Sequence, residues 1–268
     1  MYQSAHTPWE WHKPLFEHAK KQEITIFSSP FDKSAVDLLE DLNAPAYKIA
    51  SFEVIDLELI KYVASTGKPL IMSTGMATKD EIAEAISCAK QAGCQQLAIL
   101  HCVSGYPSPV SDCNLVTITD MVKTFGLLTG LSDHSLSNGP AVASIALGAC
   151  IIEKHFTLDR LGGGADDSFS MEPKDLEELV DLTSSAHEAI GTVAYHLKQS
   201  EIDNIKFRRS LYFVKALKAG QTITSDSVRS IRPGYGMLPK MLTSVIGSKL
   251  KVSVEVGMPV TADVIVKI

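Results

Sequence analysis

The 268-residue sequence contains no apolar run that approaches the roughly 18–20 residues a membrane-spanning helix needs. It has no long block of lysine and arginine, and its net charge of −6 argues against a surface for nucleic acid or anionic membrane. Its first residues do not show the charged-then-apolar pattern of a secretory signal. These absences predict a cytoplasmic protein that binds neither nucleic acid nor membrane.

Cysteine is sparse, and its spacing is uninformative for metal or disulfide frameworks. The count is odd, and no C-x-x-C pair occurs, which argues against a disulfide scaffold and against a zinc knuckle. We expect most of these cysteines to be small core residues. They are Cys88, Cys94, Cys102, Cys113 and Cys150.

Apolar runs alternate with helical patterns over about the first 190 residues. The runs are short, rich in Ile, Leu and Ala, and show little alternation, which is typical of strands buried on both faces. The candidate strands are 23–28, 46–50, 69–73, 95–101, 126–131 and 150–155. The candidate helices are 11–21, 33–42, 55–65, 79–92, 113–124, 138–147 and 174–191.

Strands that alternate with helices imply parallel βαβ units. A closed (β/α)8 TIM barrel has eight such units, so six strands predict a barrel lacking about its first two βα units. An open doubly wound sheet is the alternative, but no Gly-x-Gly-x-x-Gly follows any strand. We expect a barrel domain over 1–193, a polar linker over 194–206 and a small β-rich domain over 207–268, with strands at 210–214, 252–256 and 260–266.

Polar residues recur where the barrel strands would end, and this is the edge at which such barrels carry chemistry. Hydroxyl groups beside a lysine suit a phosphate, which presents several acceptor oxygens. Lys48 lies inside an apolar run and needs an anion, which Glu53 or a bound phosphate or carboxylate would supply. The strand-end candidates are Ser28, Ser29, Lys48, Ser51, Glu53, Ser73, Thr74, Gly75, Ser104, Tyr106, Ser132, His134, Lys154 and His155.

His134 and His155 end two successive strands. Either one alone is better explained as a structural histidine, but adjacent parallel strands lie about 4.8 Å apart, so the pair is placed to share one divalent ion. With two protein ligands, water and substrate would complete the coordination, as in a catalytic site. We expect Asp133 and Glu153 to orient the imidazole rings.

Two further segments have alternative interpretations. Asp166 and Asp167 follow the last strand in a glycine-rich loop, where they would bind sugar hydroxyls or simply belong to a polar turn. Arg232, like Arg208 and Arg209, would present a guanidinium to an anion or carry a solvated surface charge.

Together these segments resemble the sialic acid synthase family, most closely its pseudaminic acid synthase branch. The Gly-Gly-x-Asp-x-x-Phe-Ser form of 163–170 favours that branch. Residues 207–212 and 232–236 resemble the C-terminal antifreeze-like (SAF) domain of the family. The other stretches that carry the resemblance are 7–11, 27–32, 44–51, 73–76, 130–134 and 152–158.

The resemblance implies the condensation of phosphoenolpyruvate with an amino-sugar aldehyde, through C–O cleavage. A divalent metal on His134 and His155, usually manganese with magnesium or cobalt as alternatives, would polarise the aldehyde. Lys48 would bind the phosphate charge, and Glu53 would transfer protons. The residues implied to line the pocket or bind substrate are Ser29, Ser51, Ser73, Ser104, Tyr106, Ser132, Asp166 and Arg232.

The resemblance also implies a domain-swapped homodimer, in which Arg232 enters the site of the partner subunit. Family members carry about two more βα units before the point that Met1 matches, so the sequence resembles an N-terminally truncated member. Two competing hypotheses follow. One is a synthase for N-acetylneuraminic or legionaminic acid, and the other is a non-catalytic remnant that binds a partner.

Overall fold

A computed structural model describes residues 7–266 of the chain. These residues fall into two compact units that divide after Gly191, and each is described by itself. Within the described residues, no helix is both long and apolar enough to cross a membrane.

The first unit is built on a five-stranded parallel sheet whose strands are ordered as they occur in the sequence. Short apolar segments form these strands because both faces are covered along most of their length. The strands are β1 (Tyr47–Ile49), β2 (Leu70–Ser73), β3 (Leu97–Cys102), β4 (Leu128–Asp133) and β5 (Ile152–Lys154).

Helices precede, connect and follow the strands, and each predicted helix is present within a few residues of its expected bounds. They are α2 (Trp9–Lys21), α3 (Lys33–Asp41), α4 (Leu57–Ser65), α5 (Lys79–Gln91), α6 (Val116–Phe125), α7 (Gly139–Ala146) and α8 (Pro173–Ile190). A capping box starts α5: Glu81 N donates to the Thr78 hydroxyl, and Thr78 N donates to the Glu81 carboxylate.

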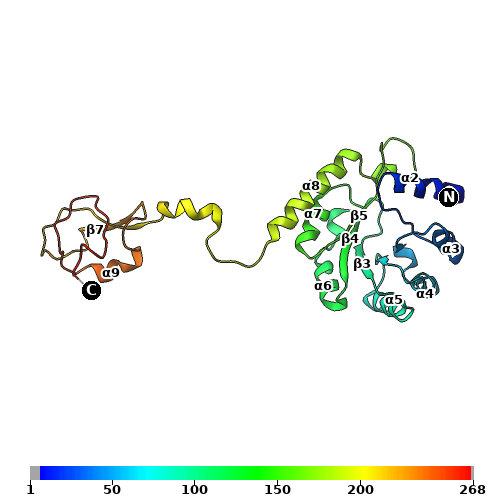
Figure 1. Ribbon diagram of the computed structural model, residues 1–268, viewed down its shortest axis with the longest axis horizontal. Coiled ribbons are helices and arrows are strands. Elements are labelled where there is room, and N and C mark those ends of the chain that lie inside the picture. Colours follow the sequence, from blue (N-terminus) through cyan, green and yellow to red (C-terminus); the bar gives the residue numbers. More distant parts are fainter. Residues whose placement is uncertain (1–6, 267–268) are drawn as a thin grey trace. The chain divides into compact units, whose positions relative to one another are not determined.

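Consecutive strand order has a consequence for where the helices lie. Because βαβ connections are right-handed, an unbroken order from β1 to β5 places every connecting helix on the same face of the sheet. Figure 1 shows α3 to α8 following one another around the outer side of the strands. This single-sided winding is that of a barrel and excludes the doubly wound alternative.

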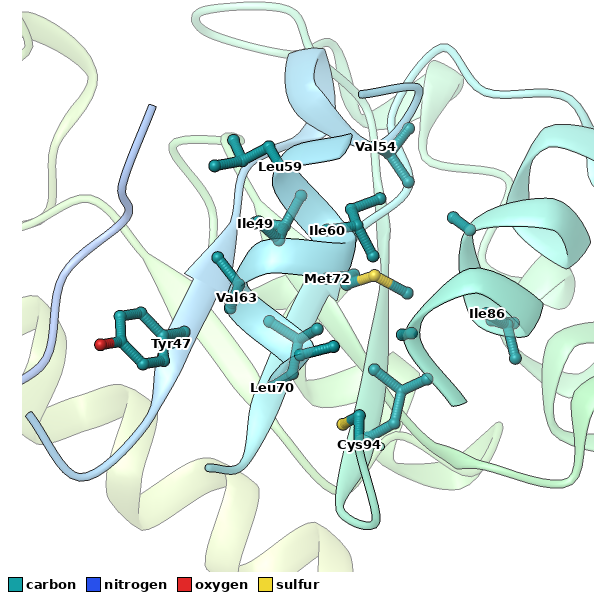
Figure 2. Packing of buried hydrophobic residues seen from close by; sticks show 14 of the residues in the cluster. Tyr47, Ile49, Val54, Leu59, Ile60, Val63, Leu70, Met72, Ile86 and Cys94 are labelled. Carbon is teal, nitrogen blue, oxygen red and sulfur yellow. The ribbon is translucent and has the colours of Figure 1, made fainter. Parts of the chain in front are cut away.

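The main core lies between β1–β3 and helices α3–α5 (Figure 2). Tyr47 and Ile49 of β1, with Leu70 and Met72 of β2, are buried against the helices. Since side chains alternate across a strand, Lys48 faces the opposite, inner side of the sheet.

The sheet is strongly curled, as a contact between its first and fifth strands shows. Lys48 Nζ lies 3.6 Å from Glu153 Oε2. In a flat sheet four strand spacings would hold these backbones roughly 19 Å apart, whereas a lysine and a glutamate side chain together reach about 10 Å. The inner face is therefore concave, which gives the unit the shape of part of a barrel.

The strand predicted at 23–28 is wrong. This segment lies beside β1 but forms a single parallel bridge, between Ser28 and Tyr47. Its apolar side chains find little cover: Ile24 is 65% exposed and Phe27 is 38% exposed. Burial on both faces, which holds the other strands, is missing here, so one bridge is all that forms.

The second unit carries its own small core, with the buried residues Leu211, Phe213, Ile223, Val228, Val245, Leu250, Val254, Val260, Val264 and Ile265. Two antiparallel strands, β6 (Ser210–Phe213) and β7 (Val228–Ile231), pair in register. Short helical elements also occur in this unit, and they are η4 (Gln199–Phe207), η5 (Pro239–Met241) and α9 (Leu242–Val245).

The sequence predicted only part of this second unit. The run at 210–214 contains β6, but 252–256 and 260–266 form isolated bridges instead of strands. Frequent turns interrupt the ladder, and only Val254, Val260, Val264 and Ile265 of these segments are buried. The strand at Val228–Ile231 was not predicted, because it is only four residues long and Val228 alone among them is buried.

Candidate functional site

The candidate site lies at the carboxyl ends of the strands, on the concave face. Residues that alternate with the core positions point to this face: Lys48 from β1, Ser73 from β2, Cys102 from β3, Ser132 from β4 and Glu153 from β5. Curling of the sheet gathers these polar side chains around one hollow edge.

His134 and His155 come together just beyond β4 and β5, as predicted. Their ring centroids are 5.1 Å apart. His134 Nδ1 lies 2.9 Å from the Val103 carbonyl oxygen, and His155 Nδ1 lies 3.3 Å from Asp166 Oδ2. Both partners accept hydrogen bonds, so each Nδ1 carries the proton and each Nε2 keeps a free lone pair.

This arrangement fits one divalent ion. With metal–nitrogen bonds of about 2.1 Å, two imidazoles on a single ion place their ring centres roughly 4.6–5.3 Å apart. The observed 5.1 Å falls in that range. No group of three or more His, Cys, Asp and Glu side chains able to hold a metal occurs within residues 7–266, so these two histidines would leave coordination positions for substrate and water.

Asp133 and Glu153 do not orient the imidazoles, which corrects the expectation from the sequence. In the register of β4 and β5, Asp133 lies opposite Lys154 and Ser132 lies opposite Glu153. Asp133 Oδ2 accepts from Lys154 Nζ at 3.0 Å on the buried side, and Ser132 Oγ donates to Glu153 Oε1 at 2.6 Å on the concave side. Asp166 is the carboxylate that contacts an imidazole.

Lys48 pairs with Glu153 and not with Glu53, the residue that the sequence had suggested. Lys48 is 7% exposed, and its Nζ also donates to the Ile49 carbonyl oxygen at 3.1 Å. Burial lowers the pKa of Lys48, although the negative charge of Glu153 opposes the shift. The Glu153 carboxylate thus binds both the Lys48 ammonium group and the Ser132 hydroxyl group.

Glu53 follows β1 at the end of η1 (Ser51–Glu53). Its Oε2 is buried without a hydrogen-bond partner among the described residues. Burial raises the pKa of Glu53 above its usual value, which favours the protonated acid over the carboxylate. A raised pKa makes a carboxylate a better proton acceptor, so Glu53 is suited to exchange a proton with a substrate.

Electrostatics at the two histidines differ. Burial and the neighbouring His134 lower the pKa of His155. Burial alone would lower the pKa of His134 as well, but hydrogen bonds with Cys102 and the Val103 carbonyl outweigh it and raise that pKa.

Ser51 and Ser104 meet around Gly75, which follows β2. Gly75 N donates to Ser51 Oγ at 3.1 Å, and a Cβ on Gly75 would collide with the Ser104 hydroxyl. Gly75 therefore lets two hydroxyl groups approach its backbone. Ser73 Oγ is buried and has no hydrogen-bond partner within residues 7–266, so it is available to a ligand.

Ser29 follows the parallel bridge between Ser28 and Tyr47, which places it next to Lys48 at the edge of the sheet. It lines a cavity of about 350 Å³ beside α2 and α3, together with Trp9, Phe31 and Asp32. In the part of the chain that the structure describes, its side chain makes no hydrogen bond with the strand-end residues.

Aromatic rings surround the histidine pair. Tyr106, a predicted site residue, lies with its ring centroid 4.3 Å from His134 and 5.8 Å from His155. Phe169 lies 5.1 Å from His155 and 5.5 Å from Tyr106. The sequence did not identify Phe169 as a site residue, although it belongs to the Gly-Gly-x-Asp-x-x-Phe-Ser motif that also contains Asp166.

Two further residues bear on the site. Cys102, at the end of β3, is buried, and its Sγ lies on the concave face 3.9 Å from both Ser104 Oγ and His134 Nδ1. Arg232 is exposed and lies directly after β7, in the second unit.

Comparison with known proteins places this geometry in a family. Residues 1–195 match the NeuB family, and residues 208–266 match the SAF domain. The chain is 38% identical over 264 residues to the pseudaminic acid synthase of Helicobacter pylori, covering 98% of this chain and 78% of that protein.

Other relatives support the same grouping. The N,N'-diacetyllegionaminic acid synthase of Campylobacter jejuni is 38% identical over 229 residues, which cover 84% of this chain and 69% of that protein. The crystal structure of N-acetylneuraminic acid synthetase from Leptospira borgpetersenii superposes with a TM-score of 0.70 at 33% identity, over 75% of this chain and 70% of that one. The chain belongs to the NeuB family, with a SAF domain at its C-terminal end.

Proposed function

We propose that the chain is a phosphoenolpyruvate-dependent synthase of the pseudaminic acid type. It would join phosphoenolpyruvate, 2,4-diacetamido-2,4,6-trideoxy-L-altrose and water to give pseudaminic acid and phosphate, with cleavage of the C–O bond to phosphate. One observation carries the proposal: His134, His155 and the buried Lys48 converge with strand-end hydroxyl groups on one concave edge. Similarity to pseudaminic acid synthases over 98% of the chain supports this choice.

The proposal assigns His134 and His155 to a divalent metal, manganese in preference to magnesium or cobalt. Both Nε2 atoms are free because both Nδ1 atoms face hydrogen-bond acceptors. When bound, the ion supplies Lewis acidity that polarises the sugar aldehyde. Asp166 holds the His155 ring in the orientation that binds the ion.

The remaining residues act on phosphoenolpyruvate and the sugar. Lys48 supplies positive charge to the phosphate, and Ser51 and Ser73 supply hydroxyl donors. Ser132 would join them when its hydroxyl turns from Glu153 to the phosphate. Glu53, with its raised pKa, exchanges the proton of the condensation. We also assign Ser104, Tyr106 and Asp166 to the sugar side of the pocket.

The curled sheet fits the later part of a (β/α)8 barrel whose first two βα units have no counterpart in the printed sequence. Sequential strand order and helices on one face support this assignment.

The same proposal includes a homodimer, a cytoplasmic location, substrate contacts from Ser29 and a contribution of Arg232 to sugar binding. Substituting Arg232→Ala is expected to raise KM for the sugar, and sedimentation of the chain tests the dimer.

Turnover tests the proposal. The full chain is incubated with phosphoenolpyruvate, manganese and the diacetamido sugar, and phosphate release is followed with and without chelator. Metal-dependent release is the expected result, and His134→Ala is expected to abolish manganese binding while His187→Ala, on the exposed face of α8, leaves it unchanged. Folded protein that binds manganese but releases no phosphate would overturn the proposal.

A second candidate function is synthesis of legionaminic or N-acetylneuraminic acid. The 38% identity to a legionaminic acid synthase equals that to the pseudaminic acid synthases. Comparing kcat/KM across the three matching amino sugars separates these functions, and a preference for a mannosamine would favour the second. A folded chain that binds no substrate would favour the non-catalytic remnant.

A further inference from the structure

We propose that Phe169, together with Tyr106, forms an apolar wall that receives a methyl group of the amino sugar and so determines which sugars the site accepts. This inference rests on the proposed function, because it concerns the sugar held at the histidine pair. Phe169, whose neighbours are the rings of Tyr106 and His155, would thus help to select the substrate.

Four rings form a closed circuit around the place where the sugar aldehyde would bind. Successive centroids lie 5.1 Å apart from Phe169 to His155, 5.1 Å from His155 to His134, 4.3 Å from His134 to Tyr106 and 5.5 Å from Tyr106 to Phe169. The two imidazoles provide the polar half of this circuit. Phe169 and the Tyr106 ring provide the apolar half, directly beside the imidazoles.

The loop that carries Phe169 is held in place by its own hydrogen bonds. Asp167 accepts from the Thr157 hydroxyl and from Gly164 N, each at 2.7 Å. Ser170, which is 2% exposed, donates to the Asp166 carbonyl oxygen at 2.7 Å. A wall fixed in this way can discriminate between ligands, since it does not yield to a group that fits poorly.

Phe169 has no group that can pair with a hydroxyl. A sugar hydroxyl pressed against its ring would lose hydrogen bonds to water, whereas a methyl group there gains by leaving water. The wall therefore favours an amino sugar that carries a methyl group near the aldehyde. Two sources of this methyl exist in the proposed substrate: the acetamido groups and the deoxygenated end of the chain.

Matched pairs of sugars distinguish these sources. One pair differs only by acetamido against hydroxyl at carbon 2, and the other by methyl against hydroxymethyl at carbon 6. We expect wild-type protein to prefer the methyl-bearing member of one pair, and Phe169→Ala to reduce that preference about tenfold, since one apolar group is worth roughly 10–200-fold in discrimination. Leu161→Ala, at a 92% exposed position in the same loop, is the control and keeps the preference.

Equilibrium binding of the corresponding reduced sugars, which lack the aldehyde and cannot react, is measured beside turnover. A Phe169→Ala protein that binds manganese normally but discriminates as wild-type does would overturn the inference, as would equal losses for every sugar. Phe169→Leu, which keeps an apolar side chain, is expected to retain most of the preference and guards against misfolding. Wild-type protein that shows the binding preference without turnover would overturn the proposed function alone.

Discussion

Lys48 and Glu153 meet across the concave face although they belong to the first and last strands of the sheet. A buried lysine needs a counter-charge, and Glu153 supplies it while also accepting from Ser132. A phosphate bound at Lys48 and Ser132 would contact two groups that Glu153 already holds close together. This ion pair forms only because the sheet is curled, and it lies at the proposed anion site.

Phosphoenolpyruvate affinity should fall as pH rises through the lowered pKa of Lys48. Only the protonated lysine attracts the phosphate, and burial moves its pKa below the ordinary value of 10.5. The loss is therefore expected in the range below pH 10.5, at lower pH than for a solvated lysine. Calorimetric titration of phosphoenolpyruvate across this range measures it.

Lys48→Arg is the matched comparison, since a guanidinium stays charged throughout that range. Its affinity should remain level with pH even if it is weaker overall. The free energy of unfolding should change with pH in the opposite direction. The pKa of Lys48 is depressed in the folded state, so the folded protein binds fewer protons at this group than the unfolded chain does. The contribution of Lys48 to stability therefore rises with pH between the lowered pKa and 10.5. Identical pH curves for wild type and Lys48→Arg would contradict this role of Lys48.

Asp166→Asn should weaken manganese binding about 10–100-fold, the usual effect of losing a carboxylate that orients a ligating histidine. Asp166 Oδ2 lies 3.3 Å from His155 Nδ1, and an amide in its place supports the imidazole less strongly. Manganese titration followed by electron paramagnetic resonance measures the change. Asp181→Asn, at an exposed position of α8, serves as the control.

A different result would assign Asp166 to the sugar. If the carboxylate binds only sugar hydroxyls, Asp166→Asn keeps the manganese affinity of wild type and raises KM for the sugar instead. Manganese affinity and KM for the sugar, measured together, show whether the Asp166 carboxylate acts on His155 or on the sugar.

The sequence predicted the seven helices and the polar strand ends because both depend on neighbours along the chain. Capping at Thr78 and apolar periodicity are local signals. The partner of Lys48 was not predictable in this way, since Glu153 reaches it only after the sheet has curled. Glu53, the nearer carboxylate in sequence, was the wrong partner for the same reason.

Alternation along strands explains the other error. Asp133 precedes His134, and Glu153 lies two residues before His155, so closeness in sequence suggested that these carboxylates orient the rings. In the sheet, however, Asp133 faces the buried side with Lys154, and Glu153 faces the concave side with Ser132. Applying the two-residue period to β4 separates Asp133 from His134. The same period leaves Glu153 on the face of His155, where Glu153 instead pairs with Ser132 and Lys48.

Gly130→Ala should destabilise the first unit by about 1–3 kcal/mol or more, the cost of overpacking a filled site. A Cβ at Gly130 would lie 2.6 Å from Leu100 Cδ2 and 2.8 Å from Ile151 Cβ, and closer still to the Ile151 carbonyl oxygen. The neighbouring backbone belongs to the sheet and cannot easily move. Urea unfolding followed by tryptophan fluorescence measures the loss, because both tryptophans lie in the first unit.

Gly105→Ala provides the control for that experiment. A Cβ there would find its nearest atom at 3.6 Å, an ordinary van der Waals contact. We expect its unfolding midpoint to stay close to that of wild type. Equal midpoints for Gly130→Ala and wild type would show that β3, β4 and the segment before β5 pack less closely than the structure indicates.

Asp133→Asn should cost the first unit about 3–5 kcal/mol, because it leaves a buried lysine without its counter-charge. The side chains of Lys154 and Asp133 are 7% and 1% exposed, and Asp133 also accepts from Ser135 N at 2.8 Å. Asp120→Asn breaks the Lys79–Asp120 pair in the same unit, where both side chains are more than half exposed. That exposed pair is expected to contribute at most about 1 kcal/mol, and urea unfolding of the two variants side by side measures the difference. Similar losses for both variants would mean that water reaches the Asp133–Lys154 pair, and hence that the buried side of β4 and β5 is open.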